Sequence, residues 1–334
     1  MTLSFLAWAK FFVCVTVIGL AGFRLVRYGD AIAALTGMTR NWVGMILIAT
    51  VTSLPELVTG LSAVTLVAAP DIAVGDALGS CVFNLAIFAL VDLLYRDESV
   101  YARASPTHVL SAAFGVLLLG ATGLAILLSA GEVIPVFGHV SAASGVLLML
   151  YLLAMRTIYR LEQRQGIDPA AELTGMSLGR ALTGYGIAAS AIVAAGIWLP
   201  FVGVELAQTM GWTNSFVGTL FIAFATSVPE IATTLGALRI GAIDMALGNL
   251  LGSNLFDVLI LVLDDLVYRP GPIFRDVAPV HAATAIFACV MSGAVIVALV
   301  VRPTTRVLRT MSWASLSLVA LYLINAAVQF RHGQ

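Results

Sequence analysis

The sequence predicts an all-α polytopic membrane protein with ten transmembrane helices, arranged as two inverted five-helix repeats. Three observations lead to this fold class. The 334-residue chain is 60% hydrophobic and only 10% charged, whereas soluble domains carry about 25% charged residues. Its apolar stretches are long enough to cross a bilayer as helices of about 20 residues. Finally, two long segments, one in each half of the chain, are similar to each other.

Hydropathy separates ten candidate spans, and no segment has the short alternating strands of a membrane barrel. The spans cover residues 4–26, 41–68, 72–95, 107–129, 136–157, 181–208, 213–239, 245–268, 278–301 and 310–330. The longest polar stretch, residues 159–180, is interpreted as a cytoplasmic connector. The expected units are therefore a first five-helix repeat at 1–158 and a second, inverted repeat at 181–334.

The basic residues predict the orientation of the chain in the membrane. Of the 17 Lys and Arg residues, 13 fall in alternate connections and four on the opposite side. The richer side is expected to be cytoplasmic, so both termini are expected to be extracytoplasmic in a multi-pass inner-membrane protein. A net charge of −1 implies no attraction to nucleic acid. The oligomeric state is left open, and a monomer is compatible with the sequence.

The internal repeat is seen when residues from Val43 are aligned with residues from Val217. The offset is 174 up to a loop and 173 after it, and the matching pairs are Thr52 with Thr226, Ser53 with Ser227, Pro55 with Pro229, Glu56 with Glu230, Ser80 with Ser253, and Asn84 with Asp257. Each unit contains five predicted helices, an odd number, so the second copy must be upside down. Inverted repeats are an architecture of secondary transporters, which bind substrate near the midplane where the copies meet.

Two glutamates, Glu56 and Glu230, fall in the middle of apolar spans. A carboxylate at the bilayer centre costs at least about 2.5–3.5 kcal/mol. No Lys or Arg lies in the interior of the second, third, seventh or eighth span, so a basic side chain is not the expected partner. A bound metal ion or a proton remains.

A proline precedes each glutamate, and oxygen-bearing side chains surround the motif. Pro55 and Pro229 cannot donate to the carbonyl four residues earlier, so both helices should bend and leave backbone oxygens short of donors. Ser53 and Ser227 add hydroxyls. In the following spans, the pairs Ser80 with Asn84 and Ser253 with Asp257 are each one turn apart and face the same way. Such a site, rich in oxygen, suits Ca²⁺, Na⁺ or Mg²⁺ better than zinc or copper.

The two copies of T-S-x-P-E, each followed by G-S-x-x-x-[ND], resemble the two alpha-repeats of the cation/calcium exchanger superfamily, most closely those of prokaryotic sodium/calcium exchangers. The resemblance implies that Glu56 and Glu230 are central ligands shared by Ca²⁺ and Na⁺, and that the main-chain oxygens of Thr52 and Thr226 help to hold Ca²⁺. It also implies that spans one and six slide against the remaining core.

The resemblance implies further ligands around this centre. Flanking Na⁺ sites would be formed by Ser53, Ser80, Ser227 and Ser253 with the carbonyls of Ala49 and Ala223, and Asn84 and Asp257 would lie at the middle position. The sequence departs from the family at Asp76 and Cys81, where the second repeat has the more usual Asn249 and Asn254, and at the acidic Asp92, Asp264 and Asp265.

These observations predict a secondary-active antiporter that exchanges Ca²⁺ for Na⁺ by alternating access. Two alternatives stay open: coupling to H⁺, for which Asp76 adds one more acid, and a cation channel lined by the same oxygens. An enzyme is not expected, since neither a nucleophile–base pair nor a zinc motif is present. No catalytic residue and no cofactor are predicted beyond the transported ions. The choice among Ca²⁺, Mn²⁺ and Mg²⁺ is open.

Three smaller expectations concern charged residues at the span edges. Asp71 and Asp244 are expected to cap the helices that they begin. Asp265 lies four residues before Arg269, as Asp92 does before Arg96, and these are expected to be ion pairs within a helix. The four histidines are assigned no partner and no role.

Overall fold

The computed structural model describes residues 2–36, 49–95, 99–163, 176–303, 305–307 and 310–332. Its long helices are α1 (Thr2–Thr36), α5 (Pro70–Leu94), α7 (Thr107–Ala130), α8 (Ala142–Gln163), α9 (Leu178–Met210), α13 (Ile243–Val267), α15 (Val280–Val301) and α16 (Trp313–His332). The shorter helices are α3 (Ala49–Thr52), α4 (Leu54–Thr65), α6 (Val100–Arg103), α10 (Asn214–Phe216), the π-helix η2 (Val217–Ile222), α11 (Ala223–Thr226), α12 (Val228–Arg239) and α14 (Ile273–Asp276). Strands β1 (Val136–Phe137) and β2 (Val140–Ser141) form a small antiparallel hairpin.

The described residues confirm a helical, multi-pass membrane protein. Eight helices are long and apolar enough to cross a bilayer, and a ninth span results if the bent segment from Asn214 to Arg239 is counted as one. The predicted span at 41–68 is seen only from Ala49 onward, because residues 41–48 lie outside the described part of the chain. Most of the predicted connector, 164–175, lies outside it as well. The number of ten spans therefore stays a prediction.

Both T-S-x-P-E motifs break a helix, as the prolines predict. α3 ends at Thr52 and α4 begins at Leu54, with Pro55 in the first turn. In the second copy α11 ends at Thr226, α12 begins at Val228, and the two parts are bent by 43°. The break in each case is the serine of the motif, Ser53 or Ser227, whose backbone is not helical. A π-helical segment, η2, precedes the second break, and such segments often occur at functional sites.

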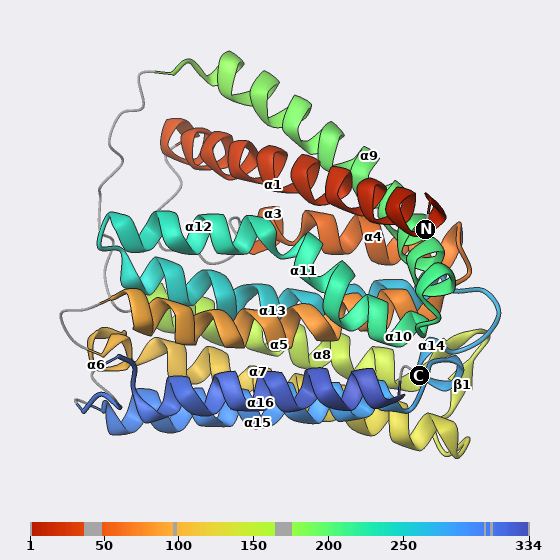
Figure 1. Cartoon of the computed structure of the whole chain (residues 1–334). Helices are drawn as coiled ribbons and strands as arrows, with labels where there is room; N and C mark the ends of the chain where they lie inside the picture. Colours follow the sequence, from red (N-terminus) through yellow and green to blue (C-terminus); the bar gives the residue numbers. More distant parts are fainter. Residues whose placement is uncertain are drawn as a thin grey trace.

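The helices form layers around α5 and α13 (Figure 1). α1 and α9 pack against each other along one side of the bundle, and the broken helices lie between this pair and α5 and α13. α7, α8, α15 and α16 cover the opposite side. α5 and α13 are the most buried of the long helices. The start of α1 and the end of α16 lie at the same end of the bundle (Figure 1).

Helix contacts occur in matched pairs between the two halves of the chain. α9 contacts α4, and α1 contacts α12. α5 contacts α15 and α16, and α13 contacts α7 and α8. Close approach of α5 to η2 depends on Gly79, because a Cβ at this position would overlap the backbone carbonyl of Thr219. Gly79 thus lets the two helices approach closely, as small residues do in membrane helix bundles.

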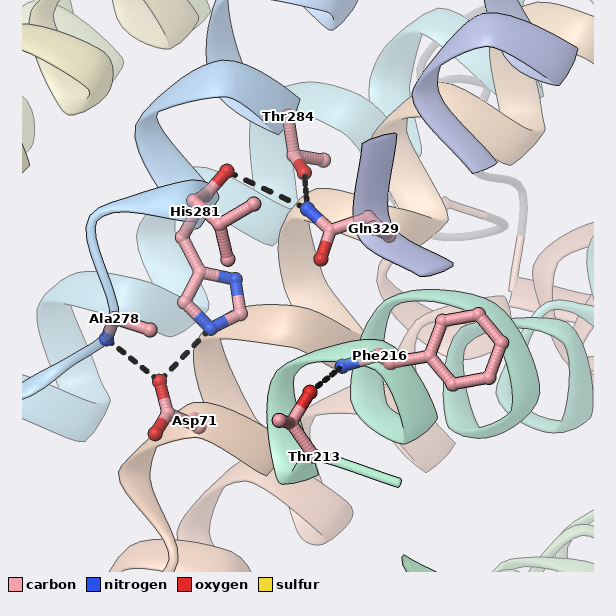
Figure 2. A network of polar contacts seen from close by, with 8 residues as sticks. Asp71, Thr213, Phe216, Ala278, His281, Thr284 and Gln329 are labelled. Carbon is pink, nitrogen blue, oxygen red and sulfur yellow. Dashed lines mark hydrogen bonds and ion pairs between the residues drawn. The ribbon is translucent and has the colours of Figure 1, made fainter. Parts of the chain in front are cut away.

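Two histidines join acidic residues from the other half of the chain, contrary to the expectation that they have no partner. His281 Nε2 and the backbone N–H of Ala278 both lie within hydrogen-bond distance of Asp71 Oδ1, at 3.0 and 2.8 Å (Figure 2). His108 Nε2 and the backbone N–H of Ser105 meet Asp244 Oδ1 in the same way, at 3.0 and 2.7 Å.

The expectation that these acids cap their own helices is wrong. Neither α5 nor α13 has a side-chain cap, and the N-cap residues are Ala69 and Ala242. Instead, Asp71 accepts a hydrogen bond from the loop before α15, and Asp244 accepts one from the loop before α7. Asp71, at the start of α5, binds Ala278 in the loop that joins the end of α13 to the start of α15. The start of α5 therefore lies at the same end of the bundle as the end of α13. The two central helices are therefore antiparallel.

Asp92 and Asp265 also bind loops rather than arginines. Asp265 accepts hydrogen bonds from the backbone N–H groups of Ser141 and Ile273, both 2.8 Å, and from the Ser144 hydroxyl. Asp92 accepts from the backbone N–H groups of Val100 and Ser312 and from the hydroxyl of Ser315. The expected Asp265–Arg269 ion pair is absent among the described residues, where Arg269 is exposed, and Arg96 lies outside them. Both carboxylates are fully buried.

Asp265→Ala is expected to lower the free energy of unfolding by about 2–4 kcal/mol, because three buried donors lose their acceptor. The fall in thermal midpoint of the purified protein in detergent measures this loss. Glu132→Ala, at an exposed loop position, is the control and should leave the midpoint unchanged. Equal midpoints for the two variants would show that the carboxylate does not hold these loops.

Candidate functional site

The two breaks bring the motif residues into the middle of the bundle. Thr52 and Thr226 end the helices before the breaks, and Glu56 and Glu230 lie in the first turn after them. Each glutamate is almost completely buried, with exposed fractions of 2% and 1%. Across the second break, the backbone bonds join Ser227 N to Ala223 O and Ile231 N to Ser227 O. Among the described residues, the carbonyls of Ala225 and Thr226 receive no backbone hydrogen bond across this break, as the proline predicts.

The neighbouring helices α5 and α13 supply the second set of predicted residues. Ser80 and Asn84 lie in the middle of α5, and Ser253 and Asp257 in the middle of α13. All four side chains are buried. Since α5 and α13 contact the broken helices as well as each other, the predicted side chains from both halves are brought together.

Each glutamate is contacted by a serine from the opposite half of the chain. The Ser53 hydroxyl is 3.4 Å from Glu230 Oε1, and the Ser227 hydroxyl is 3.5 Å from Glu56 Oε1. Ser227 also donates to Ser80 at 3.1 Å, and Ser253 lies 3.4 Å from Glu230. The contacts to the glutamates are longer than the usual 2.5–3.0 Å for O–H···O hydrogen bonds. The carboxylates are therefore only weakly bound by these hydroxyls.

Four further side chains complete the cluster, and none of them was among the predicted ligands. The Thr226 hydroxyl donates to Asp76 at 2.8 Å, and in the other copy the Thr52 hydroxyl is 3.4 Å from the Asn249 oxygen. Asn84 donates to Asn254 at 3.1 Å, and Cys81 Sγ is 3.6 Å from Asp257 Oδ2. The signal for these residues was present in the repeat alignment, where 76 matches 249 and 81 matches 254.

Five buried oxygens in this cluster have no hydrogen-bond partner among the described residues. They are Glu56 Oε2, Glu230 Oε2, Asp257 Oδ1, Asp76 Oδ2 and Asn84 Oδ1. A buried acceptor without a donor costs about 1–3 kcal/mol, and a buried charge costs more. Among the described residues, these carboxylates form no ion pair with a basic side chain. The arrangement can therefore accept positive charge, as cations or protons.

A cation here would need ligands beyond carboxylates. Among the described residues, no group of three or more His, Cys, Asp or Glu side chains is close enough to hold a metal alone. Hydroxyl, amide and main-chain oxygens would have to contribute, as hard cations allow. Of the two predicted alanine carbonyls, that of Ala223 accepts from Ser227 N at 3.0 Å and lies 3.2 Å from the Thr226 hydroxyl. Ala49 begins α3.

Comparison with known protein families gives one match that covers nearly the whole chain. The family model described as sodium/calcium exchanger protein matches residues 6–159 and 181–331. The gap between the two matched segments falls at the predicted connector.

Two known relatives are similar to the chain. The inner membrane protein YrbG of Escherichia coli K12 is 29% identical over 260 residues, which cover 75% of this chain and 76% of YrbG. The sodium/calcium exchanger MaX1 of Methanosarcina acetivorans is 35% identical over 83 residues, 25% of this chain and 24% of MaX1.

The fold is similar to that of a solved exchanger. A structure of the sodium-calcium exchanger NCX_Mj superimposes with a TM-score of 0.62 at 20% sequence identity, covering 97% of this chain and 98% of the other. At this identity the likeness supports the fold.

Proposed function

The chain belongs to the sodium/calcium exchanger protein family, and on that premise we propose that it is a secondary-active antiporter that exchanges Ca²⁺ for Na⁺. The transported ions bind at the cluster around Glu56 and Glu230, near the bilayer midplane. It is a transporter and not an enzyme. The single observation that carries this proposal is the set of five buried oxygens without a donor.

The ligand chemistry supports this choice of ions. Oxygen ligands of mixed kind are those that Ca²⁺ takes. Glu56 and Glu230 with the main-chain oxygens of Thr52 and Thr226 would hold Ca²⁺. The flanking Na⁺ sites would use the hydroxyls and carbonyls of Ser53, Ser80, Ser227, Ser253, Ala49 and Ala223, with Asn84 and Asp257 at the middle position. Competition of Na⁺ and Ca²⁺ for the same carboxylates then couples their movements.

The paired contacts support an inverted repeat of 1–158 and 181–334 around a connector at 159–180. The cross-contacts from Ser53 to Glu230 and from Ser227 to Glu56 are equivalent under the 174-residue offset. The histidine–aspartate contacts lie at the starts of the antiparallel helices α5 and α13, and so at opposite ends of the bundle. Two five-helix units of opposite orientation produce such pairs.

We propose that α1 and α9 move together to alternate access. Lys10 of α1 and Glu205 of α9 form an ion pair at 2.7 and 2.8 Å. Gly22 of α1 faces Pro229, where a Cβ would overlap the proline ring, and the repeat-related Gly196 of α9 faces Val58. Small residues give each moving helix a smooth surface next to a break. Such a surface suits sliding of packed helices.

Coupling to H⁺ is the second candidate, and Asp76 is the observation that favours it. This buried acid accepts from Thr226 inside the cluster, where the other copy has Asn249. An acid that can hold a proton at a cation site allows protons to replace Na⁺ as the coupling ion.

The test is ⁴⁵Ca²⁺ uptake into proteoliposomes under two separate gradients. Vesicles loaded with Na⁺ and diluted into Na⁺-free buffer are expected to take up ⁴⁵Ca²⁺, and uptake should stop when Na⁺ is equal on both sides. Vesicles with an acidic interior and no Na⁺ should take up little. Uptake driven by the pH gradient alone would establish H⁺ coupling. Uptake that needs no counter-ion would establish a channel.

A further inference from the structure

Asp264 is a second buried carboxylate on α13 that the candidate site does not use. Its side chain is fully buried, and neither Oδ1 nor Oδ2 has a hydrogen-bond partner among the described residues. The ion pairs in the described part of the chain do not include it. An acid within a membrane-spanning segment that has no partner is, by default, a functional residue.

The carboxylate packs directly against a glycine of the facing helix. A Cβ at Gly60 of α4 would lie 2.7 Å from Asp264 Oδ2 and 3.0 Å from Oδ1. The repeat-related positions hold different residues: Thr234 matches Gly60, and Val91 matches Asp264. The packing of α4 against α13 therefore does not require an acid here, since its counterpart is built from a threonine and a valine.

Gly60 and Asp264 lie on the same faces of α4 and α13 as the candidate-site residues of those helices. Gly60 follows Glu56 by four residues, and Asp264 follows Asp257 by seven. These separations are about one and two helical turns, so the residues share a face on each helix. The direction is toward the end of the bundle at which α4 ends at Thr65 and α13 ends at Val267. By the basic-residue count, this end is predicted to be extracytoplasmic.

We propose that Asp264, which packs against Gly60, is a transit site for the transported cation between the central cluster and this end of the bundle. This inference rests on the proposed exchange function. A hard cation that leaves Glu56 along the contact between α4 and α13 meets the Asp264 carboxylate next. The site acts from one side of the membrane only, because its repeat-related position has no acid.

The test compares Asp264→Asn and Asp264→Val in right-side-out and inside-out membrane vesicles. Asn keeps the shape without the charge, and Val is the residue of the other repeat. The apparent KM for Ca²⁺ presented at the face where α13 ends should rise about tenfold in both variants. At the opposite face it should stay within about twofold of wild type, as should equilibrium ⁴⁵Ca²⁺ binding in detergent. Asp276→Asn, which removes an exposed acid beyond the same helix, should change neither.

Equal changes of KM at both faces, or no change at either, would overturn the transit site. Loss of folded protein in both variants, detected by size-exclusion chromatography, would also overturn it by showing that the acid serves the structure. Absence of Ca²⁺ exchange in the wild-type vesicles would instead contradict the proposed function.

Discussion

Glu56→Gln and Glu230→Gln are each expected to abolish Na⁺-driven ⁴⁵Ca²⁺ uptake. Gln keeps the volume of the side chain but removes the charge that a bound Ca²⁺ requires. Loss of one partner of a buried charge pair costs about 3–5 kcal/mol, which corresponds to a factor of about 100 to 4000 in affinity. Uptake at a fixed, sub-saturating Ca²⁺ concentration, normalised to the amount of reconstituted protein, measures this effect.

The matched control for these variants is Glu132→Gln, an exposed glutamate in the turn before the β-hairpin, and it should transport like wild type. Both site variants should fold, because the serine hydroxyls that reach across to the two glutamates are as far as 3.4 and 3.5 Å from them. Wild-type uptake by either folded site variant would remove that glutamate from the binding site.

Gly22→Val is expected to slow exchange by at least about tenfold while Ca²⁺ binding is retained. A valine side chain on α1 would collide with the ring of Pro229 at the second helix break, and overpacking of a tight helix contact costs about 1–3 kcal/mol. The collision holds α1 away from its packed position, so access to one side is impaired. Single-turnover efflux from ⁴⁵Ca²⁺-loaded vesicles measures the rate, and equilibrium binding in detergent measures the retained affinity.

Gly186→Val on α9 is the control for this prediction, because a Cβ at Gly186 would meet no atom within 4 Å. It should leave both rate and binding unchanged. Equal exchange rates for Gly22→Val and Gly186→Val would contradict sliding of α1 over the break. Loss of binding together with rate in Gly22→Val would point to damage of the site instead.

The sequence predicted those features that depend on local chemistry or on the internal repeat. The helix breaks at Ser53 and Ser227 follow from proline, which removes a donor whatever surrounds it. The gathering of Glu56, Glu230 and Asp257 followed from matching the two halves, since equivalent positions of an inverted repeat meet near its axis.

The contacts that the sequence could not predict join residues from distant elements. Asp265 was expected to pair with Arg269 one turn away, but it binds backbone N–H groups of loops that the chain places beside it. A carboxylate at a helix end gains more from two buried N–H donors than from one exposed guanidinium. The partners of His108 and His281 were missed for the same reason, because each lies more than a hundred residues away.

The most direct test of the central claim is the position of a bound divalent cation. Sr²⁺ replaces Ca²⁺ at oxygen sites and can be located by its anomalous scattering in crystals of this protein. The account predicts a single strong peak between Glu56 and Glu230, with carboxylate oxygens of both at about 2.3–2.6 Å or slightly longer. A peak elsewhere in the bundle, or none there in protein that exchanges Ca²⁺ for Na⁺, would contradict it.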